Sequence, residues 1–129
     1  MTKQKPKILV IEDEEVLLSL IKKKLSREGF DVLGVQTALD GMELLKANPG
    51  IDVIWLDHYL LGHETGLDFV TKVKQDKKWK KIPIFVVSNT AGPDKRQMYI
   101  HLGVTKYYVK ADYELGQIIT EIRKVIRLR

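Results

Sequence analysis

Four short apolar runs in this sequence each end in side chains that can take part in chemistry. These side chains are Glu12 and Asp13 after the first run and, after three later runs, Asp57, Ser88 and Lys110. Carboxylates brought together repel one another unless they share a hard cation, and few protein ligands with retained waters indicate Mg²⁺. Beside such a cation a carboxylate can attack phosphorus, while an ammonium and a hydroxyl stabilise the transferring group. Each residue alone is ordinary as a cap, turn or surface residue, so the constellation carries this hypothesis.

The elements that would position these residues follow from five apolar runs rich in Val and Ile. We expect strands at Ile8–Ile11, Val32–Val35, Val53–Leu56, Ile82–Val87 and Tyr107–Val109. Continuous apolar strands that alternate with helices indicate an α/β fold with a parallel sheet covered on both faces. Right-handed crossovers favour a doubly wound five-stranded sheet, (βα)5 and flavodoxin-like, with strand order 2-1-3-4-5. Ligands bind such a sheet beyond the carboxyl ends of its strands, where the polar residues stand.

The helices carry capping signals of their own. The first is expected to begin near the acidic run and to end at Gly29, a residue type that tolerates a left-handed cap. Thr37 is expected to cap the second helix and Asp112 the last. The apolar residues expected on the buried face of the first helix are Val16, Leu17, Leu20, Ile21 and Leu25.

Composition limits the classes of protein that remain. The chain has 129 residues, enough for one domain with a core, and no cysteine, which excludes disulfides and cysteine nucleophiles and fits a reducing compartment. The net charge is +5, and residues 72–81 hold six lysines without a DNA-reading motif, so we expect a solvated surface and no direct nucleic-acid contact. The first apolar run is too short for a signal peptide or membrane span, so we expect a cytoplasmic protein without membrane contact.

Four stretches of this sequence resemble, in order and spacing, the response-regulator receiver domain of two-component signalling. They are Ile8–Glu14, Asp52–Asp57, Ile82–Ser88 and Leu102–Lys110. The resemblance covers essentially the whole chain and implies a single receiver domain over residues 1–129 with no output domain. It implies a phosphoacceptor that assists its own phosphorylation and dephosphorylation, and no enzyme acting on other substrates.

The resemblance also assigns roles to individual residues. The Mg²⁺ ligands it implies are Glu12, Asp13, Asp57 and Tyr59, the last through its main-chain carbonyl. Asp57 would accept the phosphoryl group, which Ser88 and Lys110 would contact. Tyr107, three residues before the lysine, would be the reorienting aromatic of the switch.

Phosphorylation is expected to act as a charge switch at Asp57. About two added negative charges would draw in Ser88 and its loop, and Tyr107 would turn inward into the vacated space. This change would remodel the face made by the fourth helix, fifth strand and fifth helix, for partner binding or phosphoryl relay. The implied partners are a sensor histidine kinase or phosphotransfer protein upstream and a protein partner or homodimer downstream. Alternatively, Tyr107 is a static packing residue.

The loop after Asp57 departs from the family pattern. Leu61 stands where receivers usually have proline, and the loop to Gly66 is one residue longer. His58, His63 and Glu64 in this loop could suggest a transition-metal site, but neighbouring polar loop residues are usually solvated, and we expect that here.

Two further departures follow the fourth and fifth strands. Ala111 follows Lys110 where receivers commonly have a proline after a cis bond; a cis bond before alanine costs roughly 3 kcal/mol, so we predict a trans bond. Asn89 replaces a small residue after Ser88. Asn89 and Tyr59 could border the path of an attacking water, so we expect them to tune the lifetime of the phosphoryl bond.

Three other functions are compatible with a domain of this size and fold class. A flavin- or nucleotide-binding domain needs a phosphate cradle after the first strand, but residues 12–15 are four consecutive acids. A hydrolase would need a nucleophile elbow, which the sequence lacks. A receiver-like protein-binding scaffold that is not regulated by phosphorylation is the main alternative, because Leu61, Asn89 and Ala111 are atypical.

Overall fold

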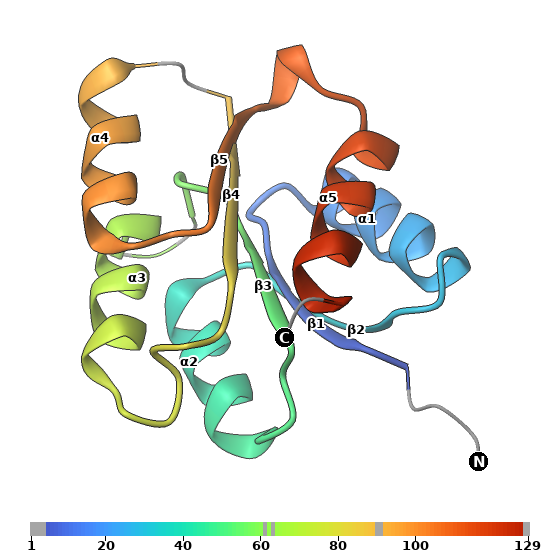
Figure 1. Cartoon of the computed structure of the whole chain (residues 1–129), viewed down its shortest axis with the longest axis horizontal. Helices are drawn as coiled ribbons and strands as arrows, with labels where there is room; N and C mark the ends of the chain where they lie inside the picture. Colours follow the sequence, from blue (N-terminus) through green and yellow to red (C-terminus); the bar gives the residue numbers. More distant parts are fainter. Residues whose placement is uncertain (1–4, 61, 63, 90–91, 128–129) are drawn as a thin grey trace.

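The chain forms a five-stranded parallel sheet between two layers of helices (Figure 1). The computed structural model describes residues 5–60, 62, 64–89 and 92–127. The strands are β1 (Lys7–Ile11), β2 (Asp31–Val35), β3 (Val53–Leu56), β4 (Ile84–Ser88) and β5 (Lys106–Val109). The helices are α1 (Glu15–Arg27), α2 (Ala38–Ala47), α3 (Gly66–Gln75), α4 (Pro93–Leu102), the short 3-10 helix η1 (Lys110–Asp112) and α5 (Leu115–Arg127). The strand order is β2-β1-β3-β4-β5, so the predicted fold is confirmed.

Alternate residues of the strands build two apolar cores, one on each face of the sheet. Leu9 and Ile11 of β1 pack in the core covered by α2, α3 and α4. Ile8 and Val10 pack in the other core, against α1 and α5. All four side chains are fully buried. Because both faces are covered, these strands read as continuous apolar runs. None of the described helices has the length and apolar character needed to cross a membrane.

Strand register brings the carboxyl ends of β1 and β3 to the same edge. Ile11 pairs with Leu56, so the residues that follow each of them leave the sheet together. The Asp57 amide donates to the Ile11 carbonyl at 2.9 Å, which fixes the start of the loop after β3. Ser88 at the end of β4 pairs with Val109 of β5, so this edge continues across the sheet.

The helix signals are confirmed in part. The Thr37 side chain accepts a hydrogen bond from the Asp40 amide and caps α2, and Gly29 after α1 has a left-handed φ of 92°. The Asp112 cap is wrong, because Asp112 lies in η1 and α5 begins at Leu115.

The predicted buried face of α1 is also wrong in part. Ile21 and Leu25 are buried as expected, but Val16 is 69% exposed and Leu20 is 53% exposed. The stripe that packs against the core passes through the partly buried Leu17 and the buried Ile21 and Leu25, at intervals of four residues. Val16 and Leu20 each precede a stripe residue by one position, which turns them about 100° around the helix axis and away from the sheet.

Candidate functional site

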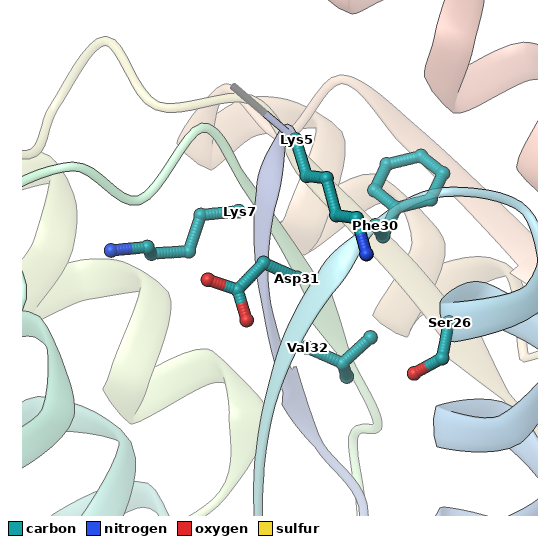
Figure 2. Close-up of a pocket in the computed structure, with 6 residues that line it drawn as sticks. All are labelled: Lys5, Lys7, Ser26, Phe30, Asp31 and Val32. Atoms are coloured by element: carbon teal, nitrogen blue, oxygen red, sulfur yellow. The ribbon is translucent and has the colours of Figure 1, made fainter. Parts of the chain in front are cut away.

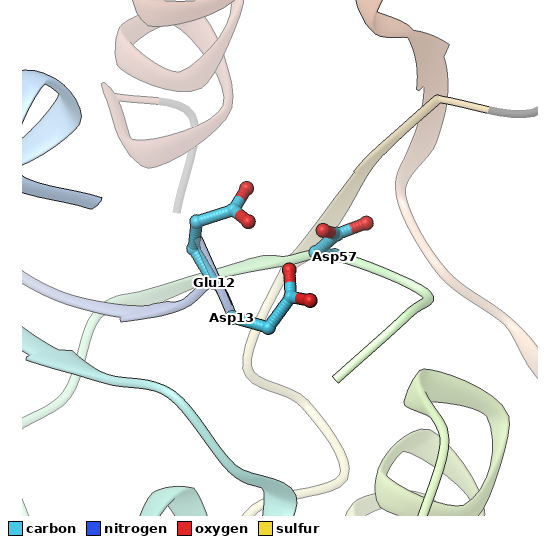
Figure 3. Close-up of side chains that lie close together, drawn as sticks. All are labelled: Glu12, Asp13 and Asp57. Carbon is cyan, nitrogen blue, oxygen red and sulfur yellow. The ribbon is translucent and has the colours of Figure 1, made fainter. Parts of the chain in front are cut away.

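Three carboxylates meet at the carboxyl edge of the sheet. Glu12 and Asp13 follow β1 and Asp57 follows β3; one ligand atom from each lies within 4.8 Å of the others, and Figure 3 shows the three groups close together. Glu12 is 0% exposed and Asp57 is 3% exposed, while Asp13 is half-buried. Acids that lie 45 residues apart in the chain are thus held together by strand register.

Lys110 reaches into this group from the end of β5. Its ammonium Nζ donates to Glu12 Oε1 at 2.9 Å and to Asp57 Oδ2 at 3.3 Å. Its side chain is 17% exposed. The bond between Lys110 and Ala111 is trans, which confirms the prediction for this peptide. The sequence predicts that acids distant in the chain gather at one edge of the sheet beside a lysine, and the structure places Asp13, Asp57 and Lys110 in this arrangement.

Burial and charge change the acidity of all three groups. Burial raises the pKa of Glu12 from its usual 4.5 to about 7, although the hydrogen bonds from Lys110 and from the Glu14 amide oppose the rise. Burial likewise raises the pKa of Asp57, against the lowering effect of Lys110. Burial alone would lower the pKa of Lys110, but its hydrogen bond to Glu12 and the charge of Asp57 outweigh burial, so the pKa of Lys110 is raised. The buried negative charge therefore exceeds what one lysine compensates.

One oxygen of this cluster has its hydrogen-bonding capacity unused. Asp57 Oδ1 is buried and has no hydrogen-bond partner among the described residues, whereas Glu12 Oε2 accepts from the Glu14 amide at 3.1 Å. A buried carboxylate oxygen without a partner is unfavourable unless a cation or other group meets it. Hard divalent cations take oxygen ligands of this kind, so Glu12, Asp13 and Asp57 fit Mg²⁺.

Comparison with known proteins agrees with this geometry. A family model described as the response regulator receiver domain matches residues 8–123. The chain belongs to this family. Chemotaxis protein CheY1 of Helicobacter pylori is 34% identical to this receiver over 105 residues, which are 81% of this chain and 84% of that protein. Receiver domains are signalling domains of two-component systems.

Solved structures of other response regulators have the same fold. A response regulator receiver protein from Pseudomonas putida superposes with a TM-score of 0.87 at 24% identity, covering 95% of this chain and 99% of that one. The phosphorylated cyanobacterial phytochrome response regulator RcpA superposes with a TM-score of 0.78 at 26% identity, covering 94% of this chain and 91% of that one.

The two predicted switch residues of this receiver are both buried. Ser88 is 0% exposed at the end of β4, and Tyr107 in β5 is 5% exposed. The Tyr107 ring packs against the ring of Tyr99 in α4, with centroids 5.6 Å apart. The Tyr107 ring is therefore already buried in this structure, and it does not have the solvent-exposed position from which an inward turn was expected to begin.

The two residues predicted to tune the lifetime of the phosphoryl bond are both exposed. Tyr59 is 45% exposed, Lys95 of α4 donates to its hydroxyl, and the Lys95 ammonium stands 4.4 Å from the centre of its ring. Asn89 is exposed just after β4. The contact between Tyr59 and Lys95 joins the loop after β3 to α4. Leu61, which stands where receivers usually have proline, lies outside the described residues.

Sequence reasoning missed His58. It was expected to be a solvated loop residue, but it is 4% exposed and its Nδ1 lies 2.6 Å from the Tyr99 hydroxyl oxygen. Burial lowers the pKa of His58, and the charge of Lys95 lowers it further. Its partner lies 41 residues away, so no local signal could have identified the contact.

The other two polar residues of this loop differ in what the structure says of them. Glu64 pairs with Lys72, and His63 lies outside the described residues. Within the part of the chain that the structure describes, the carboxylates at the sheet edge form the candidate metal-binding group.

Proposed function

We propose that this receiver is the phosphoacceptor of a two-component phosphorelay and that Asp57 takes up the phosphoryl group in a Mg²⁺-dependent reaction. The observation that carries the proposal is the Asp57 carboxylate: its Oδ2 accepts from the ammonium of Lys110, and its buried Oδ1 has no hydrogen-bond partner among the described residues. Phosphorylated RcpA, which is 26% identical to this chain, supports it. A sensor histidine kinase or a phosphotransfer protein would donate the group in the cytoplasm.

Each residue of the site has a part in this transfer. An Asp57 carboxylate oxygen forms the new bond to phosphorus, and the bond from phosphorus to the donor breaks, its electron pair leaving with the donor. Lys110 places a positive charge beside the oxygens that accumulate negative charge, and the Ser88 hydroxyl can donate to one of them. Mg²⁺, held by Glu12, Asp13, Asp57 and the main-chain carbonyl of Tyr59, would supply further positive charge.

The output is a change at the face formed by α4, β5 and α5. Phosphorylation adds negative charge at Asp57, which attracts Ser88 and the end of β4. Because the phosphoryl group only biases an existing equilibrium, a downstream partner or a second copy of the chain would distinguish the two populations by binding this face. Tyr107 belongs to this face as a buried residue whose packing changes, and an inward turn from solvent is not needed.

Loss of the phosphoryl group requires water to reach phosphorus. We propose that Tyr59 and Asn89 limit this access, because both are exposed, because they follow Asp57 by two residues and Ser88 by one, and because Tyr59 is held by Lys95. Asn89→Ala is expected to change the rate of dephosphorylation, followed by loss of the phosphorylated mass after the donor is removed. An unaltered rate would exclude this role for Asn89.

The decisive experiment follows Trp55 fluorescence while Mg²⁺ and a small acyl phosphate are added. Trp55 is fully buried two residues before Asp57, so its emission reports on this site. We expect a Mg²⁺-dependent change and a phosphorylated mass in the wild type, and neither the phosphoryl-dependent change nor the mass in Asp57→Asn.

A matched control removes a carboxylate from the opposite edge of the sheet. Asp31 begins β2 there and lines a basic hollow of about 610 Å³ with Lys5 and Lys7 (Figure 2). Asp31→Asn should leave both signals as in the wild type. An unphosphorylated wild type under these conditions would favour the alternative, a scaffold that binds partners without this regulation.

A further inference from the structure

A buried hydrogen bond ties the residue after Asp57 to helix α4. His58 is 4% exposed and Tyr99 is 0% exposed, and 2.6 Å separates the His58 Nδ1 from the Tyr99 hydroxyl oxygen. In one tautomer the hydroxyl donates to Nδ1, and in the other the Nδ1–H donates to the hydroxyl. Separating such a pair is unfavourable, because both polar groups would remain buried without a partner. The loop after β3 and α4 are therefore held at a fixed distance.

The start of α3 packs tightly around this hydrogen bond. The Gly66 amide donates to the His58 carbonyl at 2.9 Å. A Cβ on Gly66 would lie 2.4 Å from the Tyr99 hydroxyl and 2.9 Å from the Asp57 carbonyl. The loop backbone, the beginning of α3 and the Tyr99 side chain thus touch without room between them. The Asp57 backbone cannot shift without moving at least one of these neighbours.

The same tyrosine continues the contact toward β5. The Tyr99 ring lies edge-on to His58, with centroids 5.6 Å apart at 88°. Its other neighbour is Tyr107, also 5.6 Å away between centroids. Asp57 is thus linked through the His58 backbone, one hydrogen bond and two packed rings to the inner side of α4 and β5. Every side chain in this series is buried.

We propose that His58 and Tyr99 are positioning residues that couple helix α4 to the Asp57 loop, so that phosphorylation shifts α4 through their hydrogen bond. This inference rests on the function proposed for Asp57. It adds a route from the phosphoryl site to α4 that is separate from the movement of Ser88. If phosphorylation changes the affinity for a partner that binds and displaces α4, linkage requires that this partner changes the phosphoryl equilibrium at Asp57 by the same factor.

The test compares hydrogen–deuterium exchange of α4 with and without Mg²⁺ and beryllofluoride, a phosphoryl mimic. Trp55 fluorescence in the same samples reports binding at the site. Tyr99→Phe removes only the hydroxyl and keeps the ring. The matched control is Tyr108→Phe, since the buried Tyr108 hydroxyl has no hydrogen-bond partner among the described residues. A second pair, His58→Asn and His58→Leu, respectively keeps and removes a hydrogen-bonding atom next to the backbone.

We expect beryllofluoride to change α4 exchange in the wild type and in Tyr108→Phe by roughly fivefold or more, the usual size of a coupling between linked sites. Tyr99→Phe and His58→Leu should still give the Trp55 signal, but beryllofluoride should then cause little or no change in the exchange of α4. His58→Asn should restore the change in α4 exchange. If Tyr99→Phe does not fold, as judged by thermal unfolding, the two His58 variants decide the question.

Failure of this inference differs from failure of the proposed function. A wild-type change in α4 that persists undiminished in Tyr99→Phe and His58→Leu would overturn the coupling and leave phosphorylation of Asp57 intact. The same follows if the wild type gives the Trp55 signal without any change in α4. A wild type that responds at neither place would overturn the proposed function, and this coupling with it.

Discussion

Replacing Glu12 with glutamine should make the metal-free protein more stable above neutral pH. Glu12 is fully buried, and burial raises its pKa from the usual 4.5 to about 7. In the window between these two values the folded chain holds a proton that the unfolded chain has released. The free energy of unfolding therefore falls as pH rises from about 4.5 to about 7.

The size of this loss follows from the change in pKa. A rise from 4.5 to about 7 corresponds to roughly 3 kcal/mol that the folded wild type loses across the window. Glutamine resembles the protonated form and has no charge to bury. Glu12→Gln should thus match the wild type near pH 4.5 and exceed its stability by up to about 3 kcal/mol at pH 8.

The assay is urea unfolding at a series of pH values in the presence of a chelator. Glu43→Gln is the matched control, because Glu43 carries the same charge on the exposed side of α2, 63% exposed, and should leave the pH dependence unchanged. Mg²⁺ at pH 8 should stabilise the wild type more than Glu12→Gln, since the cation compensates the buried carboxylates. Parallel pH profiles for the wild type and Glu12→Gln would refute the reasoning.

Two further substitutions test the site and its packing. Gly66→Ala should lower the free energy of unfolding by about 1–3 kcal/mol, because its Cβ would fall 2.4 Å from the Tyr99 hydroxyl. Gly50→Ala, where a Cβ meets no atom of the described residues within 4 Å, should be neutral in the same urea assay. Lys110→Met should tighten Mg²⁺ binding in a Trp55 titration, since the ammonium and the cation compete for the same carboxylates, and should slow phosphorylation. Weaker Mg²⁺ binding would contradict this account of Lys110.

Much of the fold was predictable from the sequence because the signals are local. Runs such as Val53–Leu56 are apolar at every position, which indicates a strand buried on both faces wherever it lies in the sheet. Gly29 and Thr37 mark helix ends through their own backbone and side-chain chemistry. The edge that gathers Asp57 and Lys110 then follows from parallel strands, whose carboxyl ends share one side of the sheet.

The sequence did not determine contacts between distant segments. The apolar residues of α1 could not be divided into a buried stripe and the exposed Val16 and Leu20 until the rotation of the helix on the sheet was known. His58 lies in a polar loop, and its burial depends on the packing of Tyr99 of α4 against it. The inward position of Tyr107 depends on the same ring.

By itself, then, the sequence determined the order of elements and the kinds of groups at the carboxyl edge. The tertiary structure decided their distances, which place Lys110 Nζ 2.9 Å from Glu12 and 3.3 Å from Asp57, and it decided which polar groups lose their water. Burial and pairing energies depend on these distances and on solvent access, and both arise only when segments far apart in the chain pack together.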